Sequence, residues 1–178
     1  RSTMVRDVFI EEIVKKKKEP LDWLKIIAIL VLCLALAVGF LFLGMFFPFC
    51  WVLAGLSIYF GYFFISRRSI EFEYSLTNDT FDVDKIIAKR TRKRLISTSC
   101  KNFDDFGQYY PEEHTQKQYE KIYFACNSRK SENLWYFVAK GSNEGNSLVV
   151  FNGSERLLAG IKEQIPRHMY QELFGRMQ

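Results

Sequence analysis

A chain of 178 residues has room for one ordinary domain plus an appendage. Apolar residues make up 48% of it, but no Asp, Glu, Lys, Arg or His occurs in the 41 residues from Ile26 to Ser66. The rest of the chain is too short to enclose that run, which argues against a buried core hairpin in an ordinary soluble protein. The formal charge of +5 is less informative than the placement of the charges beside the run.

The leading segment, residues 1–20, combines a helical apolar pattern with a basic end. Val5, Phe9 and Ile13 recur every four residues, acidic residues lie on the other side, and four lysines close the segment. This pattern predicts an N-terminal tail with a short amphipathic basic helix. Such a helix would lie on the surface of a membrane or pack against the soluble domain, and both interpretations stay open.

Residues 21–66 are predicted to form a two-helix transmembrane hairpin. About 20 apolar residues cross a bilayer as a helix, so the uncharged run suffices for two crossings if a turn divides it. The stretch "GMFFPFCW" supplies the turn, since Gly44 is permissive and Pro48 disfavours helix before it. We expect helices from about Asp22 to Leu43 and from about Phe49 to Ile65. A cleavable signal peptide would have a shorter apolar region.

The charges beside the run predict its orientation. Lys15 to Lys18 and Lys25 precede it, Arg67 and Arg68 follow it, and the connecting turn is uncharged. The positive-inside rule then predicts a multi-pass protein of the cell membrane with both termini in the cytoplasm. Small-residue pairs at Ala35/Gly39 and Ser57/Gly61 would let the two helices pack on each other, or let the hairpin form a homo-oligomer.

Residues 67–178 are predicted to form a cytoplasmic, mainly-β soluble domain that folds by itself. Alternation of apolar and polar residues is clearest from Ile70 to Leu76, followed by a tight turn at Thr77–Thr80. A second turn is expected around Arg90 to Lys93. Seven antiparallel strands are predicted in all: Ile70–Leu76, Phe81–Ile87, Arg94–Ser99, Asn102–Tyr110, Tyr119–Asn127, Leu134–Lys140 and Ser147–Phe151. The fourth of these, Asn102–Tyr110, is either a strand or a bent segment.

A C-terminal helix follows the strands. Ser154 is a helix N-cap signal, and Leu157, Ile161 and Ile165 then recur at helical spacing until Pro166. A weaker helical stretch, "RHMYQELFGRM", comes after the proline. The predicted fold class is therefore a membrane α-helical hairpin plus a soluble domain of seven antiparallel strands and a C-terminal helix.

The strand count and order resemble the pleckstrin-homology fold, a bent sheet whose open end is plugged by a C-terminal helix. The chain also resembles a family of small two-helix membrane proteins of Gram-positive bacteria, through "RDVFIEEIVKKKK", "EYSLTNDTFDVDKIIAKRTRKRL" and "NSLVVF". The resemblance to this family brings no established activity, whereas the resemblance to bacterial pleckstrin-homology-like domains implies a protein-interaction or scaffold module. Members of the fold that bind phosphoinositides do so in a long basic loop between their first two strands. The loop expected there, Asn78-Asp79, is short and acidic, which makes such a pocket improbable.

Basic residues are the main candidates for a binding site. The stretch "DKIIAKRTRKRL" would form a mobile basic tip at the second hairpin. The tip and the residues beside the helices would contact lipid headgroups or a protein partner, and the alternative is a solvated edge that prevents strand aggregation. No nucleic acid is expected, because no aromatics interleave the basic run. The candidate residues are Lys15, Lys16, Lys17, Lys18, Arg67, Arg68, Lys89, Arg90, Arg92, Lys93 and Arg94.

Catalytic and metal-binding patterns are weak. His114 and His168 are the only histidines, and no CxxC or HxxxH motif occurs. Cys33, Cys50, Cys100 and Cys126 are widely spaced, which favours reduced thiols over disulfides. We expect no cofactor, no metal and no enzymatic activity.

The leading hypothesis is a membrane-anchored, non-enzymatic interaction or scaffold module held at the inner leaflet. Its partners would be membrane lipid and a protein. The alternative is an accessory subunit of a larger membrane complex, such as a transporter or envelope machine, that binds through the helical hairpin.

Overall fold

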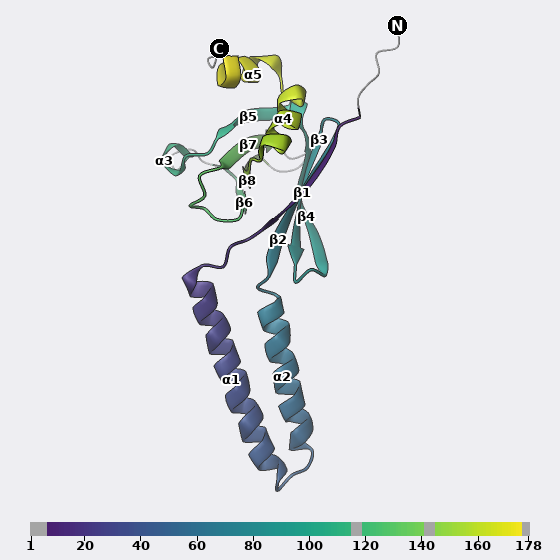
Figure 1. The fold of residues 1–178 in the computed structure, drawn as a ribbon, viewed down its shortest axis with the longest axis vertical. Helices are drawn as coiled ribbons and strands as arrows, with labels where there is room; N and C mark the ends of the chain where they lie inside the picture. Colours follow the sequence, from purple (N-terminus) through teal and green to yellow (C-terminus); the bar gives the residue numbers. More distant parts are fainter. Residues whose placement is uncertain (1–6, 115–118, 141–144, 176–178) are drawn as a thin grey trace. The chain divides into compact units, whose positions relative to one another are not determined.

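The computed structural model describes residues 7–114, 119–140 and 145–175, and the chain divides into two compact units (Figure 1). The sheet unit comprises the chain up to Lys16, residues 71–86 and the chain from Arg92 onward. The helical unit comprises Lys17–Ile70 and Ile87–Thr91. The chain therefore starts in the sheet unit, passes through the helices, and returns.

The first sheet of the sheet unit has the order β1-β2-β3-β4. Its strands are β1 (Phe9–Lys15), β2 (Ile70–Thr77), β3 (Thr80–Ile87) and β4 (Thr91–Ser99). β1 pairs with β2 in antiparallel register, from Phe9 opposite Thr77 to Lys15 opposite Glu71. The two strands are adjacent in the sheet although the whole helical hairpin separates them in the chain.

β1 corrects the prediction of an amphipathic helix in the leading segment. Residues 9–15 form a strand, while residues 1–6 of the expected tail lie outside the described residues. The segment is rich in Phe, Ile and Val, which favour strands, and pairing with β2 satisfies its backbone. Ile10 is buried, whereas Phe9 and Ile13 on the opposite face are exposed.

The second sheet corrects the prediction of purely antiparallel pairing. It comprises β5 (Phe103–Gln108), β6 (Lys121–Ala125), β7 (Leu134–Lys140) and β8 (Asn146–Asn152), in the order β5-β7-β8-β6. β7 is antiparallel to β5 and β8, but β6 pairs with β8 in parallel. The described residues thus contain eight strands rather than seven.

Side-chain hydrogen bonds join the loop that follows β6 to the end of β8, the strand that pairs with β6. Asn152, at the end of β8, accepts a hydrogen bond from the Asn127 backbone N–H at 2.7 Å. The Asn152 side-chain amide donates to Asn127 Oδ1 at 3.0 Å. Strands that are consecutive in sequence usually pair, but here β8 lies between β6 and β7 in the sheet.

Aromatic rings from both sheets form the core of the sheet unit. Tyr74 and Phe81 extend from the first sheet and meet Phe137 and Phe151 from the second. Ring centroids of Phe81 lie 5.5 Å from those of both Phe137 and Phe151, within the range of favourable aromatic contacts. All four side chains are fully buried, so the two sheets share one core.

Three short helices and a 3-10 turn complete the sheet unit: η1 (Cys100–Asn102), α3 (Pro111–His114), α4 (Glu155–Gln164) and α5 (Arg167–Phe174). α4 confirms the predicted C-terminal helix, and the Ser154 hydroxyl caps it by accepting from Leu157 N at 3.1 Å. That hydroxyl also donates to the Glu12 carboxylate of β1 at 2.7 Å. A Cβ added to Gly160 would lie 2.6 Å from Ile10 Cδ1, so α4 packs closely on β1.

Replacing Tyr74 by Phe should destabilise the sheet unit by about 2 kcal/mol. The buried Tyr74 hydroxyl donates to the Ala125 carbonyl and accepts from Asn152 N at 3.2 Å, which links β2 to the ends of the adjacent strands β6 and β8. The substitution keeps the ring but leaves two buried backbone groups without this partner. Chemical denaturation of the full chain in detergent would measure the change. Tyr110→Phe, at an exposed site, is the control and should have little effect.

The helical unit contains α1 (Pro20–Gly44) and α2 (Cys50–Ser66), which lie close to the predicted bounds and run side by side (Figure 1). A Cβ on Gly61 would lie 2.8 Å from Cys33 Sγ, so the absence of a side chain at Gly61 allows the helices to approach. Among the described residues, α1 is the one helix long and apolar enough to cross a membrane, while the apolar α2 is shorter.

Candidate functional site

The eleven predicted site residues are divided between the two units. Lys17, Lys18, Arg67, Arg68, Lys89 and Arg90 belong to the helical unit, whereas Lys15, Lys16, Arg92, Lys93 and Arg94 belong to the sheet unit. The structure therefore does not place all of them in one unit. The run "KRTRKR" is split after Thr91, where β4 begins.

Arg92 and Arg94 neutralise acidic side chains of the neighbouring strands. Arg92 Nη2 lies 2.5 Å from Glu73 Oε2, and Arg94 Nε lies 3.0 Å from Asp84 Oδ1. Asp84 also lies 3.8 Å from Arg92 Nη1, and Asp82 lies 3.6 Å from Arg94 Nη2. The prediction of a mobile basic tip is wrong for these two arginines, because they extend from a strand and pair with carboxylates beside them.

Glu73 is the most unusual member of this ion-pair network. It is only 5% exposed, although it lies on a face with three other acidic residues, Glu71, Asp82 and Asp84. Burial raises the pKa of Glu73, and a hydrogen bond with the Glu11 side chain raises it further, while Arg92 opposes the shift. The network depends on its arginines, since unpaired buried carboxylates are costly.

The turn between β3 and β4 has a strained backbone. Ala88 and Lys89 adopt left-handed φ angles of 54° and 56°, which side chains other than glycine and asparagine disfavour. Arg90 N donates to Ile87 O at 3.1 Å and closes the turn. The turn thus precedes β4 directly, earlier than the predicted position around Arg90 to Lys93.

Lys89→Gly should stabilise the protein by about 1 kcal/mol, because glycine adopts the left-handed conformation without the steric cost. A thermal or denaturant unfolding curve of the full chain would measure it. Lys93→Gly is a control at a nearby strand position, where glycine should destabilise instead. Equal effects of the two substitutions would contradict the assigned turn.

Basic and aromatic side chains combine at the open end of the helical pair. The Lys18 ammonium lies 5.3 Å from the centre of the Trp23 ring, and the Arg67 guanidinium lies 4.6 Å from the Phe63 ring. The Ala88 N–H donates to Ser69 O at 2.8 Å, which joins the β3–β4 turn to the segment that follows α2. We refer to the basic residues of the helical unit as the basic collar: Lys17, Lys18, Lys25, Arg67, Arg68, Lys89 and Arg90.

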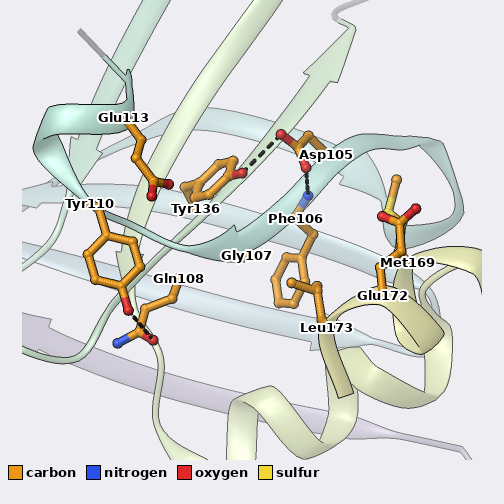
Figure 2. A pocket seen from close by; sticks show the side chains of 10 residues that line it. All are labelled: Asp105, Phe106, Gly107, Gln108, Tyr110, Glu113, Tyr136, Met169, Glu172 and Leu173. Carbon is orange, nitrogen blue, oxygen red and sulfur yellow. Dashed lines mark hydrogen bonds between the residues drawn. The ribbon is translucent and has the colours of Figure 1, made fainter. Parts of the chain in front are cut away.

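A cavity of about 280 Å³ lies in the sheet unit between β5, β7, α3 and α5 (Figure 2). It is lined by Asp105, Phe106, Gly107, Gln108, Tyr110, Glu113, Tyr136, Met169, Glu172 and Leu173. Three of these are carboxylates and none is basic, so the cavity would repel a phosphate group. No local sequence pattern predicts this cavity, because its residues come from separate elements.

Hydrogen bonds inside the cavity hold its polar groups without assembling a catalytic pair. Tyr136 donates to Asp105 Oδ2 at 2.9 Å, and Tyr110 donates to Gln108 Oε1 at 3.0 Å (Figure 2). Burial, followed by the hydrogen bond to Asp105, raises the pKa of Tyr136 well above its ordinary value. The raised pKa favours the protonated hydroxyl, which donates the hydrogen bond to Asp105.

Cys100, Cys126 and His114 are buried. Burial raises the pKa of the Cys100 thiol to about 12 and also raises the pKa of Cys126, which opposes thiolate formation. The buried His114 donates from Nδ1 to the Tyr110 carbonyl at 2.9 Å. Within the described part of the chain, no group of three His, Cys, Asp or Glu side chains could hold a metal ion.

Comparison with protein families matches residues 6–171 to a family described as bacterial PH-like domain (DUF6106). The match covers both the helices and the two sheets. No curated protein and no solved structure matches the chain.

Proposed function

The chain belongs to the bacterial PH-like domain family (DUF6106), and from this we propose that it is a non-enzymatic interaction module anchored in the cell membrane by α1 and α2. PH-like domains typically bind lipids or proteins rather than catalyse reactions. The main observation that supports the proposed anchoring is that the apolar helix α1 is exposed: only 11% of its most apolar stretch is buried. A core helix of a soluble protein would be mostly covered by its own chain.

The dimensions of the two helices support two crossings. The uncharged part of α1, Ile26–Gly44, is about 28 Å long, and the 17 residues of α2 give about 26 Å. A bilayer core is about 30 Å thick, and a slightly short helix is accommodated by local thinning. The turn between them contributes exposed Met45, Phe46 and Phe47 and no charge.

The collar supports an orientation with both termini in the cytoplasm. Basic residues flank α1 on its N-terminal side and α2 on its C-terminal side, and cytoplasmic flanks carry such an excess. The domain would then lie at the inner leaflet. Residues 16–19 connect β1 to α1, residues 67–69 connect α2 to β2, and four residues reach at most about 14 Å.

Cysteine accessibility in intact cells would test the proposal. In a chain without its four cysteines, Phe47→Cys at the turn should react with a membrane-impermeant maleimide added outside. The matched Ser69→Cys should react only after the membrane is broken. Labelling of Ser69→Cys in intact cells, or recovery of the protein from a detergent-free supernatant, would contradict the anchoring or its orientation.

A second candidate function, an accessory subunit of a larger membrane complex, is favoured by open space on the helices. A Cβ added to Gly39 or Gly55 would meet nothing within 4 Å, so another helix could approach at these positions. Purification of the full chain in mild detergent distinguishes the two. An accessory subunit should co-purify with membrane proteins, and Gly39→Leu/Gly55→Leu should release them, whereas the lone module should retain soluble partners in both forms.

A further inference from the structure

The whole net charge of the protein resides in the helical unit. Residues Lys17–Ile70 and Ile87–Thr91 carry seven basic and two acidic side chains, a net charge of +5, which equals the formal net charge of the 178-residue chain. The rest of the chain carries 18 basic and 18 acidic residues. The excess of basic over acidic side chains is therefore confined to the helical unit.

All of that charge lies at one end of the helical pair. The run from Ile26 to Ser66 has none, and α1 and α2 lie side by side with opposite direction, since Gly61 approaches Cys33 and Gly44 approaches Trp51 (Figure 1). The beginning of α1 and the end of α2 are thus at the same end.

The two acidic residues of this unit are engaged in capping α1. The Glu19 backbone N–H donates to Asp22 Oδ2 at 3.2 Å, and the Glu19 side chain accepts from the backbone of the first turn. Their carboxylates accept hydrogen bonds from backbone N–H groups at the start of α1. The seven basic groups therefore exceed the carboxylates that this unit offers them.

The β3–β4 turn adds two charges to the collar that the helix flanks do not supply. Its hydrogen bond from Ala88 N to Ser69 O attaches it three residues after α2. The left-handed conformations of Ala88 and Lys89 cost free energy, and such strain persists only where surrounding structure holds it, often at functional sites. Lys89 and Arg90 are exposed, as are Arg92 and Arg94 farther along β4, but Arg92 and Arg94 form ion pairs with carboxylates of β2 and β3.

We propose that the basic collar binds the phosphate groups of anionic phospholipids, with Lys89 and Arg90 of the turn as part of the binding surface. The proposal rests on the membrane anchoring proposed above. Lys25 directly precedes the uncharged run and Arg67 directly follows it, so in an anchored protein these groups lie at headgroup level. Arginine binds phosphate oxygens in a bidentate manner and lysine as a point charge, which suits such a headgroup.

Tryptophan quenching by brominated lipids in reconstituted vesicles would test the proposal. One full-length reporter has Phe64→Trp, near the collar end of α2, as its sole tryptophan, and a second retains only Trp51 at the turn end. Both side chains are exposed, and the native tryptophans removed from each are replaced by Phe. Quenching by brominated phosphatidylglycerol relative to brominated phosphatidylcholine then gives the local preference for anionic lipid at each end.

We expect a preference of about fivefold or more at residue 64, and none at Trp51. Lys89→Gln/Arg90→Gln should reduce the preference at residue 64 to below about twofold. Lys130→Gln/Lys140→Gln removes the same charge from the sheet unit and should leave the preference unchanged.

The outcomes separate the two proposals. If neither brominated lipid quenches either reporter, the membrane anchoring itself is wrong. If both lipids quench both reporters without preference, the protein is anchored but the collar does not bind anionic lipid. An equal loss of preference in the two double variants would show a general charge effect and would overturn the role of the turn.

Discussion

A fragment of residues 67–178 should fail to fold, although the sequence predicts it as a self-contained domain. The fragment lacks β1, which pairs with β2 over seven positions. A hydrogen bond contributes about 1 kcal/mol net, and burial of one isoleucine such as Ile10 contributes about 2 kcal/mol. Their loss is comparable with the roughly 5–15 kcal/mol that stabilise a whole domain.

β1 also supports the C-terminal helix. Its Glu12 accepts a hydrogen bond from the Ser154 hydroxyl that caps α4, and Ile10 packs against Gly160. Without β1, the apolar side of β2 and α4 would be exposed and the edge of β2 would be unpaired, which favours aggregation. We therefore expect the fragment to be insoluble, or to lack a cooperative unfolding transition in circular dichroism.

Restoring β1 without the helices should restore the fold. Lys15 is opposite Glu71, so a Gly/Ser linker of about four residues can join residues 7–15 directly to residues 71–178 in place of the hairpin. This relinked domain should be soluble and unfold cooperatively. A matched chain with Ile10→Asp in the linked strand should remain unfolded. A folded 67–178 fragment, or a relinked chain no more stable than it, would contradict the role of β1.

The sequence was sufficient for elements with strong local signals. The uncharged run, the proline turn and the capping serine predict α1, α2 and α4 within about two residues, since each helix depends on its own apolar pattern and termini. The turn at Asn78 was also predicted correctly, and its φ of 54° suits asparagine.

The sequence was not sufficient where pairing between distant segments decides the structure. Residues 9–15 show both helical and strand-like spacing, and only their pairing with β2, across the helical hairpin, selects the strand. β6 likewise has an ordinary strand sequence, and nothing local indicates that it lies in parallel beside β8. Propensity is a weak prior that tertiary contacts override.

Only part of the candidate site could be predicted from the sequence, again because local signals are visible there and contacts between distant segments are not. The basic residues beside the helices could be identified, because they are close in sequence to the uncharged run. The division between Arg90 and Arg92 could not be predicted, because the partners Glu73 and Asp84 come from other strands. The sequence does show Glu, Asp and Arg at alternate positions of β2, β3 and β4. This pattern indicates ion pairs between strands only once the register of the strands is known.

Arg92→Met should destabilise the sheet unit by about 2 kcal/mol at neutral pH. Loss of one partner of a fully buried ion pair costs about 3–5 kcal/mol, and we expect less here because the Arg92 side chain is 58% exposed and screened by water. Methionine preserves most of the apolar stem, so the loss should arise from the charge. Lys93→Met is the control and should change stability little, because Lys93 lies on the same strand and forms no ion pair with a carboxylate among the described residues.

The cost of Arg92→Met should fall as the pH is lowered. Burial and Glu11 already raise the pKa of Glu73, and removal of Arg92 removes the charge that opposes this shift. An acid with a raised pKa in the folded state is most favourable when protonated, so its contribution to stability is present at low pH and is lost as the pH rises through that pKa. Unfolding curves of the wild type and variant from pH 7 to about pH 5 should therefore converge. A constant difference, or one that grows on acidification, would mean that Arg92 does not stabilise an ionised Glu73.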